Sequence, residues 1–93
     1  MIAGSKAVLA LLKADLGIRH DKLDARLFTQ IETCEAELGE KGITLSEVAE
    51  DQMLLSDFAA WRWRSRLEER PALSDSLRCR IRNRQVRRRA NAE

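Results

Sequence analysis

The chain has 93 residues, of which 44% are apolar and 34% are charged, and its formal net charge is +2. This length fits one domain (1–93) with a small core, and the apolar content argues against intrinsic disorder. Two cysteines and a single histidine without ligand spacing argue against a zinc-type site, so we expect no metal and no cofactor.

The charges are unevenly distributed along the chain. Residues 1–60 carry 6 Lys and Arg against 11 Asp and Glu, whereas residues 76–93 carry 7 Arg against a single Glu. An acidic body with a basic end predicts electrostatic docking, either to nucleic acid or to acidic patches on protein neighbours. The apolar run near the start is too short and too interrupted to span a membrane and shows no signal-peptide pattern. We therefore expect a cytosol-like compartment and no membrane partner.

Two helices are predicted before the first long loop. Ser5 is a plausible N-cap for the first helix, and Gly17 ends it. The second helix begins near Asp21, and Gly39 and Gly42 frame its end. Its apolar positions recur every three or four residues at Leu23, Leu27, Ile31, Cys34 and Leu38. Its acidic residues Glu32, Glu35, Glu37 and Glu40 are interpreted as a solvated face or, alternatively, as a docking surface for the basic end of another copy.

A segment in the middle of the chain contains both tryptophans and no glycine or proline, and it predicts a long central helix at about 50–67. Leu54, Phe58 and Trp61 follow i, i+4, i+7 and form its core-facing stripe. Trp63 lies about 200° around the helix from Trp61, so the two cannot face one core. We interpret Trp63 either as half-buried under a neighbouring element or as a contact with another subunit, because tryptophan and arginine are enriched at interface hot spots.

Local signals mark the boundaries of the central and last helices. Thr44 and Glu47 fit a capping box that opens a short helical turn before the central helix. Pro71 requires a break after it, because proline lacks the backbone N–H and disfavours helix at the preceding residue. Ser74 or Asp75 can then cap a last helix.

The last helix and tail, at about 74–93, are strongly basic. Residues 77–84 (LRCRIRNR) alternate strictly, which is also a strand signal, and such a strand could pair with a neighbouring subunit. We favour a helix, because arginine is a good helix former and everything upstream is helical. On a helix, Arg78 and Arg82 share one side, and Arg80, Arg84 and Arg87 share another.

The sequence predicts one set of residues for the core and another for contacts with partners. The core anchors are Leu27, Ile31, Leu54, Phe58, Trp61, Leu77 and Ile81. The candidate interface residues are Trp63, Arg64, Arg66, Arg78, Arg80, Arg82, Arg84, Arg87 and Arg88. Asp15, Asp24 and Asp57 are too scattered to form a carboxylate pair, and no serine has a companion histidine pattern, so we expect no enzyme activity.

Three groups of segments occur in order along the chain. They are DLGI at 15–18 with LDARL at 23–27, then GITL at 42–45 with DQML at 51–54 and AAWRWRSR at 59–66, and finally LRCRIRNR at 77–84. Together they resemble the phage head–tail connector (adaptor) proteins, which are small helical subunits that form a ring beneath the portal. The resemblance covers nearly the whole chain. Arg80 and Gln85 depart from it, because small or apolar residues are expected at their positions, and the tail is more basic than expected.

The resemblance implies an all-α fold, a small bundle of four to five helices with a long central helix, and a structural function without enzyme activity. The subunit would assemble into a ring of about a dozen copies during virion assembly. Its implied partners are further copies of itself, the portal protein, tail-completion proteins and, non-specifically, the exiting DNA. It would lie in the connector region of the virion, and in the host cytoplasm during assembly. The alternative is a small basic helical DNA-binding regulator.

Overall fold

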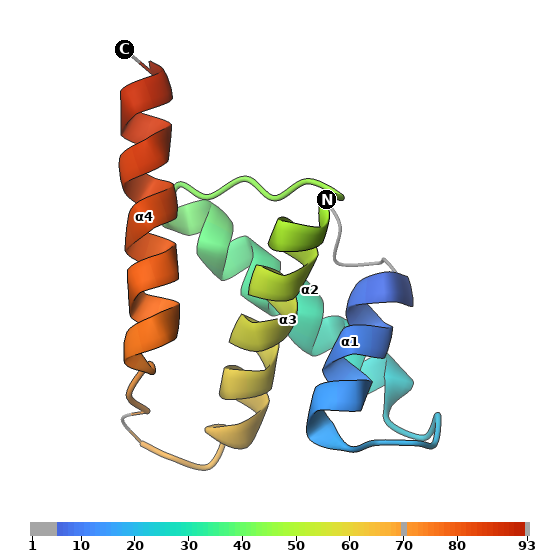
Figure 1. Ribbon diagram of the computed structural model, residues 1–93. Helices are drawn as coiled ribbons and strands as arrows, with labels where there is room; N and C mark the ends of the chain where they lie inside the picture. Colours follow the sequence, from blue (N-terminus) through green and yellow to red (C-terminus); the bar gives the residue numbers. More distant parts are fainter. Residues whose placement is uncertain (1–5, 70, 93) are drawn as a thin grey trace.

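The computed structural model describes residues 6–69 and 71–92, with the side chains of 6–69 and 71–87. Over these residues the chain is a bundle of four helices without strands: α1 (Lys6–Leu16), α2 (Asp24–Glu40), α3 (Ala49–Arg64) and α4 (Asp75–Ala92) (Figure 1). The predicted small all-helical bundle is therefore confirmed. The predicted N-cap Ser5 lies outside the described residues.

α3 packs against each of the other three helices, whereas α4 has helix–helix contacts only with α3 in the part of the chain that is described. α4 runs along one side of α3, and its last turns extend beyond the rest of the bundle (Figure 1). α3 has 16 residues, fewer than α2 with 17 and α4 with 18. It ends before the predicted boundary near residue 67, because the chain turns after Arg64 and the amide of Glu68 donates to the Ser65 carbonyl at 3.0 Å.

Glycines end the first two helices. Gly17 (φ 72°) and Gly42 (φ 88°) adopt left-handed backbone conformations, which glycine reaches without the penalty of a Cβ atom. The amide of the next residue, Ile18 or Ile43, then donates at 2.9 Å to the carbonyl five residues earlier. This is the Schellman arrangement, and it satisfies carbonyls that the helix end would leave unpaired. Gly39, predicted to frame the end of α2, lies inside the helix.

The predicted start of α2 and the predicted cap before α3 are wrong, whereas α3 begins at Ala49, close to the predicted boundary near residue 50. α2 begins at Asp24 rather than near Asp21, because residues 21–23 form a turn and the Asp24 carboxylate pairs with Lys13 Nζ of α1 at 2.8 Å. The predicted capping box before α3 is not formed, and residues 46–48 are not helical. Instead the carboxylate of Asp51, inside the helix, accepts hydrogen bonds from the amide and the hydroxyl of Ser46 at 2.7 and 2.9 Å.

α4 is helical over Asp75–Ala92, so the strand alternative for residues 77–84 is excluded. Ser74 is its N-cap, as predicted, because its Oγ accepts a hydrogen bond from the amide of Leu77 at 3.2 Å. Pro71 lies in the non-helical connection between α3 and α4.

The core lies between α1, α2 and α3, and one edge of it is closed by α4. Among the expected anchors, the buried side chains are Leu27, Ile31, Leu54, Phe58, Leu77 and Ile81. Trp61 is half-buried against the same cluster. Leu77 and Ile81 are the only buried apolar residues that α4 contributes among its described side chains. Apolar burial alone therefore holds α4 weakly, and polar contacts must supply part of its attachment.

Candidate functional site

One side of α4 is joined to α3 by ion pairs. Successive arginines on this side meet successive acids of α3: Arg80 with Asp57, Arg84 with Asp51 and Arg87 with Glu50. The first pair is closed at 2.7 Å and the third is longer, at 3.7 Å. The basic side of α4 that carries these three arginines thus finds its acidic partners within the same chain.

Asp51 is the buried member of this set. Its side chain is 6% exposed and accepts hydrogen bonds from Arg84, from the Ser46 amide and from the Ser46 hydroxyl. Burial alone would raise the pKa of Asp51, but these donors outweigh it and hold the pKa below its ordinary value. Asp51 therefore joins α3, α4 and the loop before α3 at a single carboxylate.

The other side of α4 faces solvent. Arg78 and Arg82 are exposed. Arg78 forms an ion pair with Asp75 one turn earlier, at 3.8 Å, and donates to the Leu73 carbonyl at 3.5 Å. Arg82 has no ion pair with any residue that the structure describes. The side chain of Arg88 lies outside the described residues. This exposed basic face of α4 is available to an external acidic partner.

The arginines at the end of α3 pair with α1 and α2. Arg62 forms an ion pair with Glu37, and Arg64 reaches Asp15 at 3.1 Å. Glu35, on the same helix as Glu37, is buried with only 8% of its surface exposed. The interpretation of the α2 acids as a solvated face is therefore wrong for Glu35 and Glu37, because packing against the rest of the bundle covers them. Glu32 and Glu40 are exposed.

The two tryptophans lie on different sides of α3, as their spacing predicts. Trp61 packs on Phe58 with ring centroids 5.4 Å apart, and its Nε1 donates to the Ala72 carbonyl at 2.9 Å. It thus connects α3 to the loop before α4. Trp63 is half-buried toward α2, with the guanidinium carbons of Arg26 and Arg66 at 5.6 and 4.4 Å from its ring centroid.

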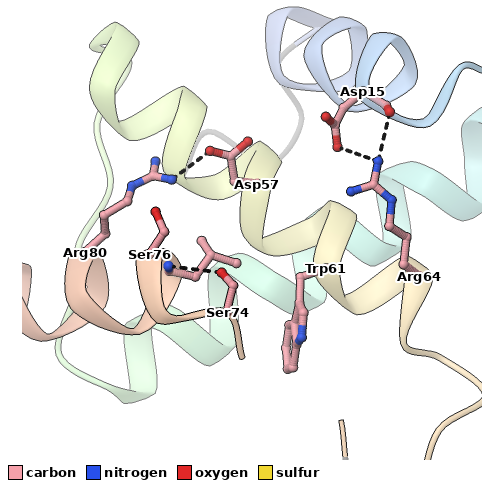
Figure 2. A pocket seen from close by; sticks show the side chains of 8 residues that line it. Asp15, Asp57, Trp61, Arg64, Ser74, Ser76 and Arg80 are labelled. Atoms are coloured by element: carbon pink, nitrogen blue, oxygen red, sulfur yellow. Dashed lines mark hydrogen bonds and ion pairs between the residues drawn. The ribbon is translucent and has the colours of Figure 1, made fainter. Parts of the chain in front are cut away.

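A pocket of about 310 Å³ opens where α1, α3 and the start of α4 meet (Figure 2). Its walls include two Asp–Arg pairs, Asp15 with Arg64 and Asp57 with Arg80, and Figure 2 shows them on opposite sides of the opening. Trp61 lies between them. Each arginine is already neutralised by a carboxylate, so the pocket offers a polar partner both signs of charge without a net excess of either.

The two cysteines differ in exposure. Cys34 is buried, and burial, with a smaller contribution from Glu37, raises the pKa of its thiol to about 12. Cys79 is exposed on α4, and both thiols are free. Among the described residues, no group of three or more His, Cys, Asp or Glu side chains could hold a metal ion. No helix in the described part of the chain is both long and apolar enough to cross a membrane.

Two contacts were not predicted from the sequence. Arg26 was not among the candidates, although it faces Trp63. Asp51 and Ser46 were not recognised as a pair. The spacing of five residues between Ser46 and Asp51 carries no standard capping pattern, and the contact between Arg26 and Trp63 depends on how α2 packs against α3.

Comparison with known proteins gives no assignment: no family model matches the chain, and neither a curated protein nor a solved structure is significantly similar to it. Function must therefore be inferred from the sequence resemblance and from the surfaces described above.

Proposed function

We propose that this chain is a structural subunit of the head–tail connector type, encoded by a phage or a prophage, which assembles into a ring between portal and tail. The observation that carries the proposal is the ordered resemblance over nearly the whole chain. The fold is compatible with it, because each resembling segment has a distinct place in the bundle. DLGI covers the end of α1 and the turn after it, AAWRWRSR covers the end of α3, and LRCRIRNR lies within the first ten residues of α4. In this proposal α3 is the central helix of the subunit.

The two departures from the family pattern have partners of their own in this chain. Arg80 pairs with Asp57 of α3 at 2.7 Å. Gln85 donates from Nε2 to the Lys41 carbonyl, in the loop after α2, at 3.1 Å. Polar residues at these positions therefore dock α4 through charge and hydrogen bonds, where small or apolar residues would dock it by packing.

Ring assembly requires each subunit to present two different surfaces, because a ring closes through head-to-tail contacts. The exposed basic face of α4, with Arg78 and Arg82, supplies a cationic surface. Exposed carboxylates on α2, Glu32 and Glu40, supply anionic ones. The proposal assigns three further partners to the cationic surface: the portal, tail-completion proteins and the DNA backbone. It places the protein in the virion.

Electron microscopy of the purified protein, alone and mixed with its cognate portal, tests the proposal. We expect rings of the protein on the portal. The alternative function, a DNA-binding regulator, is favoured by the exposed arginines of α4. Failure to bind the portal, together with tight sequence-specific binding to duplex DNA, would replace the proposed function with this alternative.

A further inference from the structure

Two features of the molecule remain without a role, and they lie at opposite ends of α2. At one end, the first turns of α2 and the last turn of α3 bring together Arg26, Trp63 and Arg66, and Leu67 follows directly. At the other end lie the last turn of α2 and the loop that leads to α3 (Figure 1). We name these the cationic end (Arg26, Trp63, Arg66, Leu67) and the acidic end (Glu40, Glu47 and the apolar hollow described below).

The cationic end holds positive charge that the chain does not neutralise. Five arginines of α3 and α4 form ion pairs with acids on other helices: Arg62, Arg64, Arg80, Arg84 and Arg87. Arg26 and Arg66 are exposed and have no carboxylate partner in the described residues. The guanidinium carbons of Arg26 and Arg66 lie 5.6 and 4.4 Å from the centroid of the Trp63 ring, so the two positive charges are at most about 10 Å apart. Two like charges held close together favour an anionic partner.

A second property of this end points to a protein partner. Leu67 is 91% exposed, the most exposed of the large apolar side chains that the structure describes. It follows Arg66 directly, so an apolar side chain projects beside the two cations. The two arginines and Trp63 also line an open pocket of about 450 Å³, together with Ala25, Thr29 and Gln30. A partner that carries carboxylates beside an apolar hollow would match both the two cations and the exposed leucine.

The acidic end of the same chain offers this combination. An open hollow of about 340 Å³ lies beside the last turn of α2. Its lining is largely apolar, with Ala36, Gly39, Ile43 and Leu45 beside Glu35 and Thr44. Glu40 directly follows Gly39, and Glu47 lies two residues after Leu45; both are exposed and have no ion pair among the described residues. The hollow is large enough for a leucine side chain, and the two carboxylates carry the charge that Arg26 and Arg66 lack.

We infer that the cationic end of one copy docks on the acidic end of the next, with Leu67 in the hollow beside Ala36 and Gly39, and with Arg26 and Arg66 against Glu40 and Glu47. The two ends are separated by 14 residues of α2, which is about 21 Å along the helix. One copy therefore cannot satisfy itself, and the contact is head-to-tail, as ring closure requires. The inference rests on the proposed function in that it names the interface between subunits of the ring.

The test is self-association measured by sedimentation equilibrium at low salt. The wild type is expected to associate as concentration rises. Leu67→Ser, the pair Arg26→Glu and Arg66→Glu, and the pair Glu40→Lys and Glu47→Lys are each expected to weaken association at least tenfold. Combining both charge-reversing pairs in one chain is expected to restore it. The control is Lys6→Glu with Arg19→Glu, which changes the net charge equally at two exposed residues outside both ends and leaves association unchanged.

Thermal melts of each variant show whether it is still folded. If one charge-reversing double variant is unstable, regained association in the combined variant still tests the interface. Association that the combined variant does not regain, or that Leu67→Ser leaves intact, overturns the interface. A wild type that stays monomeric at millimolar concentration also overturns it. These results leave the proposed function open to the portal experiment, so the two can fail separately: rings on the portal with an unaffected Leu67→Ser variant would exclude only the interface.

Discussion

Asp51 shows how one side chain can determine the position of several elements. It lies in the first turn of α3, where its charge also meets the positive end of the helix dipole favourably. Its oxygens accept from Ser46 before the helix and from Arg84 of α4. Because the side chains of Asp51 and Arg84 are both largely buried, at 6% and 15% exposed, removing either one leaves the other with an uncompensated charge.

Asp51→Asn should therefore lower the free energy of unfolding at neutral pH by about 1.5–3 kcal/mol, the range for hydrogen bonds to charged groups. The folded-state pKa of Asp51 lies below the ordinary value of 3.8. Its contribution is thus complete above pH 3.8 and is lost as the pH falls from there toward the folded-state pKa. Urea melts between pH 7 and pH 2 check this, and the difference between the two proteins should shrink as the pH falls below 3.8.

Glu50→Gln is the matched control for the Asp51 experiment. Glu50 is the neighbouring residue and also pairs with an arginine of α4, but its side chain is 66% exposed and the pair is long, at 3.7 Å. Solvent screens such a pair, so the substitution should change stability by less than about 0.5 kcal/mol. If both substitutions cost the same, or if the Asp51→Asn difference persists at low pH, burial of Asp51 would not be the cause.

At the scale of elements, α4 differs from the other helices in what holds it. Among the described residues it buries two apolar side chains, Leu77 and Ile81, and packs against one helix. Three ion pairs and the hydrogen bond from Gln85 add to this attachment. Exposed ion pairs weaken as salt screens them, whereas apolar burial does not. α4 should consequently be the most salt-sensitive helix of the bundle.

Hydrogen exchange measures this directly. Raising the salt concentration from about 0.05 to 1 M, which shortens the Debye length to about 3 Å, should speed amide exchange in α4 by about fivefold. Exchange in α1, which packs through Val8, Leu9 and Leu12, should change little. Replacing Arg80 and Arg87 with glutamine should make amide exchange in α4 fast even at low salt, and exchange in α4 should then no longer depend on salt. An equal response in α1 and α4 would contradict this account of α4.

Much of the fold follows from local patterns that the sequence displays. The helices were predicted from periodic apolar positions, and their ends from Gly17, Gly42 and Pro71, whose effects act within a few residues. The start of α3 was predicted to within about one residue, whereas the start of α2 and the contact between Ser46 and Asp51 were missed. Asp24 pairs with Lys13 of another helix, and Asp51 pairs with Arg84 of another. Local capping rules cannot anticipate such partners.

The candidate site was predictable to the same limited degree. Helical spacing separates Arg78 and Arg82 from Arg80, Arg84 and Arg87. Helical spacing alone does not show which group faces α3. That depends on where Leu77 and Ile81 pack and on which acidic residues of α3 face α4. For the same reason Glu37 resembled a solvated residue in the sequence, while Arg62, 25 positions later, covers it in the fold.

At the scale of the whole molecule, the acidic body and the basic end partly neutralise each other. Of the five arginines of α4 whose side chains are described, three pair with α3. The net cationic surface that α4 shows to a polyanion is therefore smaller than its sequence suggests. Binding to DNA should depend on the exposed face alone, because an arginine that already neutralises a carboxylate cannot displace counterions from phosphates without breaking that pair.

A comparison of two double variants tests this division. Arg78→Gln with Arg82→Gln should reduce the slope of log K against log salt for random duplex DNA by about 1.8, which corresponds to two phosphate contacts. The melting temperature should hardly change, because both side chains are exposed. Arg80→Gln with Arg84→Gln removes the same charge from the same helix but should leave the slope unchanged and lower the melting temperature, since Asp51 loses its buried partner. Fluorescence anisotropy between 50 and 200 mM salt gives the slopes. Equal slope changes in both variants would mean that α4 separates from α3 when it binds DNA. The ion pairs between α3 and α4 would then break whenever a polyanion binds.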